Sequence, residues 1–195
     1  MRKKIIIGLL ILVVVVAYFN IKGTYNSMVT YNEEVQGQWA QVENVYQRRA
    51  DLIPNLVKTV KGYADFEKST LTEVIEARSK ATSINVNADE LNPENIAKFQ
   101  QAQSQLSGAL SRLLVTVERY PELKANQNFL ELQAQLEGTE NRIAVERMKF
   151  NETTKAYNTY IKKFPTTIYA GWFDFEEKGY FESDEGASEV PEVDF

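Results

Sequence analysis

The stretch VQGQWAQVENVYQRRADLIPNLVKTVKGY, residues 35–63, decides the fold class of this chain. Its apolar side chains recur at steps of three and four residues, the spacing of a helix that buries one face against other helices. They are Val35, Trp39, Val42, Tyr46, Ile53, Leu56, Val60 and Tyr63. Arg49 takes one place in this series, and the series keeps its phase across Pro54. We therefore predict one helix over residues 26–63, kinked but continuous at Pro54 and roughly 57 Å long.

Three further segments carry the same helical spacing, and we expect helices at 66–84, 93–120 and 122–163. Asn92 followed by Pro93 is typical of a helix start, with the asparagine as the N-cap and the proline at the first helical position. Gln103 replaces one apolar residue on the seam of the third helix. The expected inward-facing residues of the three segments are Leu71, Val74, Ile75, Ala81, Ile96, Phe99, Leu106, Leu110, Leu113, Val117, Tyr120, Phe129, Leu132, Leu136, Ile143, Phe150, Tyr157 and Phe164.

Short connections between these helices make successive helices antiparallel. The fold class predicted for residues 24–164 is therefore an all-α antiparallel four-helix bundle with long first and fourth helices. Because the first and fourth helices are about twice as long as the second, we expect a stalk of two helices near the start of the chain. The full four-helix layer should lie beyond that stalk.

Before the bundle, residues 5–21 form an apolar run that is interrupted only by Asn20. At about 1.5 Å per residue these 17 residues span roughly 25 Å, close to the hydrocarbon thickness of a bilayer. A cleaved signal peptide is the alternative interpretation, but Ala17, Tyr18, Phe19 and Asn20 are too bulky for the small-residue cleavage pattern. We expect a retained single transmembrane helix, with the lipid bilayer as its partner over residues 5–21.

Charge gives this anchor a direction. Arg2, Lys3 and Lys4 precede the apolar run and Lys22 follows it, so the basic residues 1–4 are expected on the cytoplasmic side. The bundle is then expected outside the cytoplasm. Once the first 22 residues are set aside, 18 basic residues face 27 acidic ones, and this acidic balance argues against nucleic acid as a partner.

The chain contains no cysteine and no histidine. Disulfide bridges, thiol nucleophiles, Ser-His-Asp triads and histidine-ligated metal sites are therefore excluded. We expect no cofactor, and only carboxylates, hydroxyls, lysine and arginine remain for chemistry.

Polar residues on or near the apolar seams are the candidate site residues. Arg49 is expected to pair with a carboxylate such as Glu140 on the fourth helix rather than to bind a ligand. A cluster of acidic residues offers a hard cation site as a second interpretation, although such residues more often form a solvated face. These residues are Glu33, Glu34, Glu73, Glu76, Glu137 and Glu140.

Residues 165–181 form an aromatic segment that contains Trp172, Phe173 and Phe175. Two interpretations are open: the segment packs back on the bundle, or it forms an exposed surface for a partner or for the membrane interface. Residues 182–195 carry six acidic side chains and no basic ones, which is typical of a disordered tail.

Several motifs together resemble the signature of the LemA family. The longest is RRADLIPNLV at residues 48–57, continued by VKGY at 60–63, and YPELKAN at 120–126 and LEGTENRIA at 136–144 follow in order. Shorter matches are Tyr157-Asn158, Phe164-Pro165, Ala170-Gly171 and Tyr180-Phe181. The resemblance implies a bacterial protein anchored at its N-terminus in the cytoplasmic membrane, with a helical body. It implies no reaction, and the association of some relatives with magnetosome membranes suggests membrane organisation.

Three function classes follow from these observations. The first is a membrane-anchored, non-catalytic interaction or scaffold module that binds a protein partner or a second copy. The second is an accessory factor for a membrane protease or transport system, acting through Trp172 and Phe173. The third is an enzyme that uses the carboxylates of Glu137 and Glu140.

Overall fold

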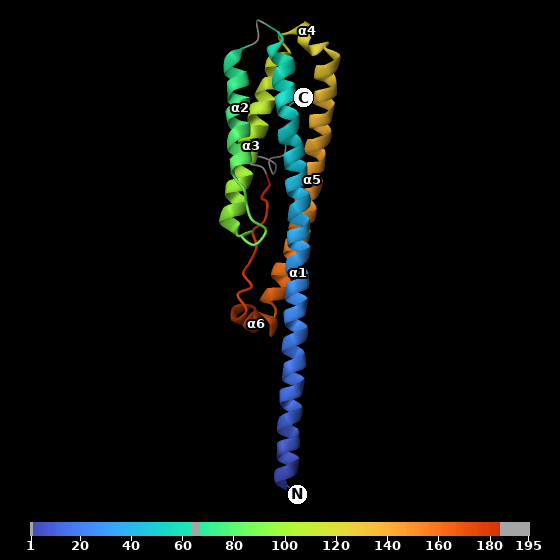
Figure 1. Cartoon of the computed structure of the whole chain (residues 1–195), viewed down its shortest axis with the longest axis vertical. Coiled ribbons are helices and arrows are strands. Elements are labelled where there is room, and N and C mark those ends of the chain that lie inside the picture. Colours follow the sequence, from blue (N-terminus) through green and yellow to red (C-terminus); the bar gives the residue numbers. More distant parts are fainter. Residues whose placement is uncertain (1, 64–66, 184–195) are drawn as a thin grey trace, which may run out of the picture.

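The computed structural model describes residues 2–63 and 67–183, and every ordered element in these ranges is a helix or a turn. The helices are α1 (Arg2–Lys61), α2 (Lys68–Ser83), α3 (Pro93–Val117), α4 (Pro121–Lys124), α5 (Gln127–Lys162) and α6 (Thr166–Trp172). Figure 1 shows α1 rising from the N-terminus, α2 returning, α3 rising again and α5 descending beside α1. The chain is therefore all-α. Residue 66 of the expected second helix and residues 184–195 of the expected tail lie outside the described ranges.

The first helix differs from its prediction because it has no break before residue 26. α1 is one helix of 60 residues, so the apolar run and the bundle helix share a single axis. Gly23 lies within it, and a glycine in a helix interior costs only about 1 kcal/mol relative to alanine. The helix hydrogen bonds on either side are enough to carry the helix through that residue.

Pro54 does not end α1, because another helix satisfies the carbonyl that Pro54 leaves without a partner. Proline has no N–H to donate to the carbonyl oxygen of the residue four positions earlier, here Ala50. The Nε of Arg78, on α2, donates to that oxygen over 2.8 Å. The proline thus creates an acceptor that ties α1 to α2.

The ends of the other helices follow their capping residues. The Asn92 side chain accepts a hydrogen bond from the Asn95 N–H, and Pro93 opens α3, as the sequence predicts. The expected fourth helix at 122–163 is instead two helices, because Asn126 caps a new start and accepts from the Phe129 N–H over 3.1 Å. The short helix α4 precedes this cap.

Two clusters of buried side chains fill the body. The distal cluster lies far from the N-terminus and takes residues from α1, α2, α3, α4 and α5, among them Leu56, Val74, Leu113 and Leu136. The proximal cluster lies nearer the N-terminus and is centred on Trp39, Phe99 and Phe150. The predicted seams are buried in these clusters, except that Ile75 and Phe164 are exposed and Tyr63, Leu132 and Tyr120 are half-buried.

The chain after α6 turns back along the body. Residues 175–183, called the strap from here on, rise in extended form from α6 toward the distal end (Figure 1). The strap lies between α3 and α5, because it makes hydrogen bonds to Gln100 on one side and to Asn151 on the other. We call this space the α3–α5 groove.

Candidate functional site

Arg49 lies between the two clusters and is 1% exposed. Its Nη1 donates to the Ser107 hydroxyl and to Oε1 of Glu140, both over 2.7 Å, and its Nη2 donates to Oε1 of Gln103 over 2.6 Å. The guanidinium also lies over the Tyr46 ring, 5.1 Å from its centre. The predicted pair of Arg49 with Glu140 is therefore present, and the second polar seam residue, Gln103, joins it.

This network connects four helices through one buried charge. Arg49 belongs to α1, Gln103 and Ser107 to α3, and Glu140 to α5. Gln103 extends the network to α2 by donating from Nε2 to the carbonyl of Ala81 over 3.3 Å. A buried charge is costly unless its donors are satisfied, so this arrangement fixes the helices relative to one another. Among the described residues, 2–63 and 67–183, Arg49 Nε has no hydrogen-bond partner.

The six acidic residues do not form a cation site. Glu73 pairs with Arg112, Glu140 with Arg49, and Glu137 accepts from Gln133 on its own helix. No group of three acidic side chains converges within residues 2–63 and 67–183 in a way that would hold a metal ion. The hard-cation interpretation is therefore wrong for the described part of the chain. Glu137 and Glu140 likewise point to different partners and form no carboxylate pair.

The α3–α5 groove holds the strap through three side-chain amides. Asn158 bonds both the N–H and the carbonyl of Lys178, over 3.0 and 2.8 Å. Asn151 does the same for Phe181 over 2.9 and 2.8 Å, and Gln100 for Glu182 over 2.9 Å in each direction. Arg147 adds a bond to the Glu182 carbonyl over 2.6 Å. Side chains here replace the strand partner that an extended segment otherwise needs.

These amides were not among the candidate site residues predicted from the sequence, although Asn158 belongs to one of the motifs quoted above. Asn151 and Asn158 are seven residues apart, so they lie on one face of α5 beside the buried Phe150 and Tyr157. A pair of asparagines at heptad spacing next to an apolar seam was the available signal. It identifies a polar stripe, but it does not name the segment that the stripe binds.

Aromatic rings line the strap, and two groups in this region, the Tyr157 hydroxyl and the Lys178 ammonium, have shifted pKa values. Phe181 is buried and its ring centre lies 5.4 Å from that of Phe150 and 6.1 Å from that of Trp39. The Tyr157 hydroxyl donates to the Glu176 carbonyl over 2.8 Å. Burial, with a smaller contribution from the Glu176 carboxylate, raises the pKa of Tyr157 to about 12. Burial lowers the pKa of Lys178, whose ammonium lies 5.9 Å from the centre of the Tyr157 ring.

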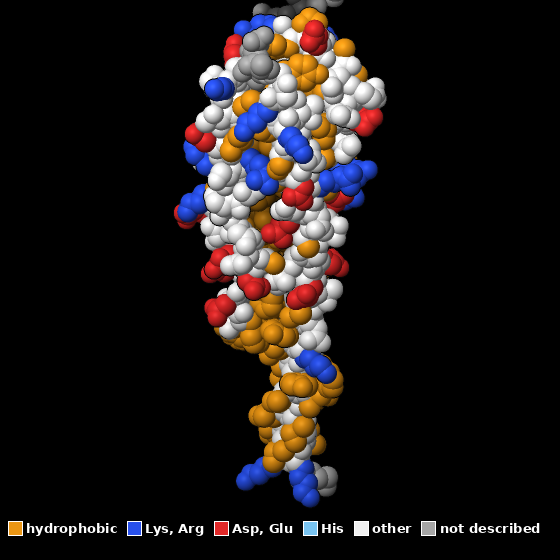
Figure 2. All heavy atoms as spheres, turned by 45° about the horizontal axis from the view of Figure 1, so that its top comes forward, with side chains coloured by type: hydrophobic (Ala, Val, Ile, Leu, Met, Phe, Trp, Pro, Cys, Tyr) orange, Lys and Arg blue, Asp and Glu red, His pale blue; other side chains and the backbone are white. Residues whose placement is uncertain are grey.

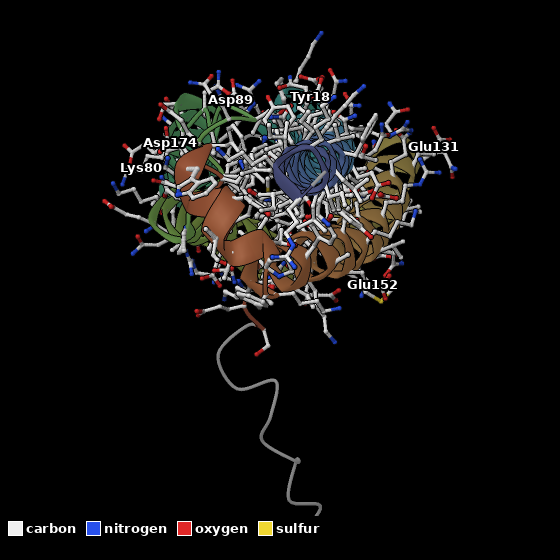
Figure 3. The ribbon with its side chains drawn as sticks, turned by 90° about the horizontal axis from the view of Figure 1, so that it is seen from below. Tyr18, Lys80, Asp89, Glu131, Glu152 and Asp174 are labelled. Carbon is white, nitrogen blue, oxygen red and sulfur yellow. The ribbon has the colours of Figure 1, made fainter. Side chains whose placement is uncertain are left out.

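The sequence left two interpretations open for the aromatic segment, and each of them holds for a different part of it. Phe175 packs on the proximal cluster, and the strap that follows it is held in the groove. Trp172 and Phe164 are 66% and 82% exposed, and Ile168 and Phe173 are also exposed. Figure 3, viewed along the molecule from below, shows α6 crossing the base of the body beside α1, with Asp174 at its far end. Back-packing therefore holds for residues 175–181 and for Tyr169 and Ala170 of α6, whereas Phe164, Ile168, Trp172 and Phe173 form an exposed apolar surface.

The exposed part is fixed to α1 by aromatic contacts. The Tyr25 ring of α1 meets Phe173 at 4.9 Å and Phe175 at 5.9 Å between ring centres, both edge to face. Tyr25 lies four residues after the end of the apolar run, so these contacts place α6 next to the end of that run. Figure 2 shows apolar side chains on the protruding first part of α1 and again at the base of the body.

The first part of α1 is the one helical stretch within residues 2–63 and 67–183 that is long and apolar enough to cross a membrane. Its most apolar window has a mean hydropathy of 2.6 and is not buried by any other part of the molecule. Fold and site together define an all-helical protein with one candidate membrane span and a body whose buried polar groups join its helices and its strap.

The chain belongs to the LemA family, whose model matches residues 38–195. It is 26% identical over 184 residues to the protein LemA of Metamycoplasma hominis, a match that covers 94% of this chain and 78% of that protein. It is also 28% identical to magnetosome protein MamQ 2 of Paramagnetospirillum magneticum and to MamQ of Magnetospirillum gryphiswaldense. Those two matches cover 81% and 80% of this chain, but only 64% of each magnetosome protein.

Proposed function

We propose that this protein is a membrane-anchored, non-catalytic scaffold of the LemA family. In this proposal residues 5–21 cross the cytoplasmic membrane once, residues 1–4 stay in the cytoplasm, and the helices form a bundle that stands on the outer surface. The names of the magnetosome relatives agree with a role in membrane organisation.

One observation carries the proposal: α6 packs on α1, and Phe173 at the end of α6 contacts Tyr25, four residues after the apolar run. Four helical residues separate Tyr25 from Ile21, a rise of about 6 Å. Exposed Phe164, Ile168 and Trp172 therefore lie at the level where a bilayer surface begins. Aromatic side chains favour this interface, because their rings suit lipid and their polar atoms suit water.

Two features of the body favour a scaffold over an enzyme. The chain has neither histidine nor cysteine to act as a base or a nucleophile. The buried charge of Arg49 is engaged by Glu140, Gln103 and Ser107, so it serves to hold helices together. An unchanged phenotype in the Glu137→Ala and Glu140→Ala double variant would rule out the third function class, an enzyme that uses these carboxylates.

The fluorescence of Trp172 tests the contact between α6 and the membrane. The chain has two tryptophans, and Trp39 is buried in the proximal cluster. In vesicles whose lipid chains carry bromine near the headgroup, emission from the natural chain should be quenched. The Trp172→Phe variant, which keeps only Trp39, is the matched control and should not be quenched. Equal quenching of the two proteins would contradict a membrane-facing α6.

Cysteine labelling tests the orientation. Because the natural chain has no cysteine, Ser79→Cys places a single thiol on the exposed face of α2. A maleimide that cannot cross membranes should label this thiol in intact cells. Labelling only after the cells are opened would place the body in the cytoplasm instead.

The scaffold role itself is tested by mild crosslinking in native membranes, followed by purification of the full chain. We expect covalent complexes with a membrane partner or with further copies. Loss of these complexes in the Trp172→Ala and Phe173→Ala double variant, with the bundle still stable, would favour the accessory-factor role. A chain that crosslinks to nothing would contradict both roles.

A further inference from the structure

The α3–α5 groove recognises the strap mainly by its main chain. Asn158, Asn151 and Gln100 each bond the N–H and the carbonyl of one strap residue. The N–H of Gly179 donates to the carbonyl of Leu91 over 2.8 Å. Any extended segment offers these main-chain groups. The amides therefore select the conformation of the bound segment, and other contacts determine which amino-acid sequence can bind.

Two positions of the strap set that identity. A Cβ on Gly179 would lie 2.7 Å from the Cα of Pro93 and 3.0 Å from the carbonyl oxygen of Asn92, so only glycine fits there without movement of the main chain. Phe181 fills a buried site between the rings of Trp39, Phe99 and Phe150. The groove therefore selects an extended segment with glycine followed two residues later by an aromatic ring. Lys178-Gly179-Tyr180-Phe181-Glu182 meets this requirement in every copy of the chain.

The connection that brings the strap to its own groove contains a non-glycine residue with a positive φ. Asp174, between α6 and the strap, has φ of 56°, in the left-handed region that residues other than glycine seldom adopt. Strain in a short hinge favours exchange of the following segment between identical chains, because exchange keeps the contacts and releases the hinge.

We propose that the α3–α5 groove also takes the strap of a second copy of this chain in the same membrane. This proposal rests on the membrane-anchored scaffold role proposed above and names its partner. Anchors in one bilayer hold the grooves of neighbouring copies at one height and raise the effective concentration of straps. Only residues 175–177 separate Asp174 from Lys178, the first strap residue that the amides hold, so this connection reaches at most about 14 Å and can pass only to a body in direct contact. Exchange therefore joins neighbours and increases with their density in the membrane.

Disulfide trapping in vesicles tests the exchange, because the natural chain has no cysteine. Gln100 and Glu182 touch across the groove, so Gln100→Cys and Glu182→Cys are placed in separate full-length chains that are reconstituted together. We expect a covalent dimer whose yield rises with protein density. The chain that carries both substitutions is the positive control for the geometry and should close the bond within one molecule.

Two matched controls separate exchange from collision. Adding Gly179→Val to the Glu182→Cys chain blocks seating of the strap and should lower the dimer yield at least tenfold. Pairing Glu182→Cys with Ser79→Cys, an exposed residue on α2, measures the yield from random encounters. A mixture that gives no more dimer than this pair, while the double-cysteine chain closes its own bond, would overturn the proposal.

A second measurement does not depend on disulfide geometry. A labelled peptide of residues 174–183 should bind the full-length Phe181→Ala chain, whose own strap is weakened. The same peptide with Gly179→Val should bind at least tenfold less tightly. No difference between the two peptides would overturn the proposal. The scaffold role would still stand if native membranes yielded crosslinks to another protein, so the two proposals fail separately.

Discussion

The distal and proximal clusters, on either side of Arg49, are built from different residues and closed by different elements. The distal cluster is mainly leucine, isoleucine, valine and alanine, with Phe129 as its buried phenylalanine. The proximal cluster is rich in aromatic rings, including Trp39, Tyr46, Phe99, Phe150, Tyr157 and Phe181. Where α1, α2, α3 and α5 lie side by side, small aliphatic groups fill the space between them. Where α2 has ended, larger rings and the strap fill it.

The difference also appears in the buried hydrogen bonds. Main-chain groups of a helix are satisfied within the helix, so the distal cluster needs few polar partners. The proximal half is closed by the loop between α2 and α3 and by the strap. The main-chain groups of these segments need side chains as hydrogen-bond partners. The indole N–H of Trp39 donates to the Val86 carbonyl over 3.1 Å, and buried Asn158 serves Lys178. Closing a core with extended chain therefore requires buried amides, whereas closing it with helices does not.

The largest expected effect separates the two clusters directly. Phe181→Ala removes a buried ring from the proximal cluster and should lower the free energy of unfolding by about 3–5 kcal/mol. Limited proteolysis in detergent should then cut the strap while α2 and α3 stay protected. Leu113→Ala in the distal cluster is the matched control, with a loss of about 2–5 kcal/mol and a strap that stays resistant until the whole body unfolds. Equal proteolysis of the strap in both variants would show that the clusters unfold as one.

The next effect concerns the network between the clusters. Glu140→Gln keeps the shape of the side chain and an oxygen that can accept from Arg49, but it removes the charge that compensates Arg49. It should cost about 1.5–3 kcal/mol, between the cost of breaking an exposed ion pair and that of breaking a buried one. Denaturation followed by Trp39 fluorescence measures it. Glu137→Gln, on the same helix but bonded to Gln133, should change the stability little. A Glu140→Gln chain as stable as the natural one would mean that Arg49 needs only its other partners.

A smaller loss is expected where the strap passes closest to a helix start. Gly179→Ala puts a methyl group against Pro93 and should cost about 1–3 kcal/mol through overpacking. Hydrogen exchange should quicken at the amides of Lys178 and Phe181 first. Gly171→Ala, with open space around its Cβ position, is the control and should leave exchange in the strap unchanged.

The smallest effect is a pH dependence of the proximal cluster. The folded state holds the Tyr157 pKa near 12. An unfolded tyrosine titrates near 10, so the folded state binds the proton more tightly between these values. The stabilisation is complete below pH 10 and is lost as the pH rises through 12. The Tyr157→Phe chain should lose less stability over this interval, and an absorbance titration should lack the tyrosine that titrates near 12. Identical alkaline profiles would contradict the burial of this hydroxyl.

Part of the candidate site follows from sequence pattern because it lies on helices. Arg49 and Gln103 interrupt apolar seams at helical spacing, so their burial and the pairing of Arg49 with Glu140 are predictable. The asparagine cap and Pro93 likewise predict the start of α3. The union of the anchor and the first helix is not predictable in this way, because Gly23 and Lys22 suggest a boundary that helix hydrogen bonding overrides.

The sequence by itself determined the four main helical segments, most of their buried faces and the apolar run, because each is a local periodicity that the chain displays residue by residue. Only the tertiary structure decided where residues 164–183 lie. An extended strap has no helical period, and the seven aromatic residues between 164 and 181 suit a core or a membrane interface equally. The choice depends on Asn151, Asn158 and Gln100, which reach the strap only after α3 and α5 are in place. Their amides hold residues 178–182 in the groove and leave Phe164 and Trp172 exposed beside α1.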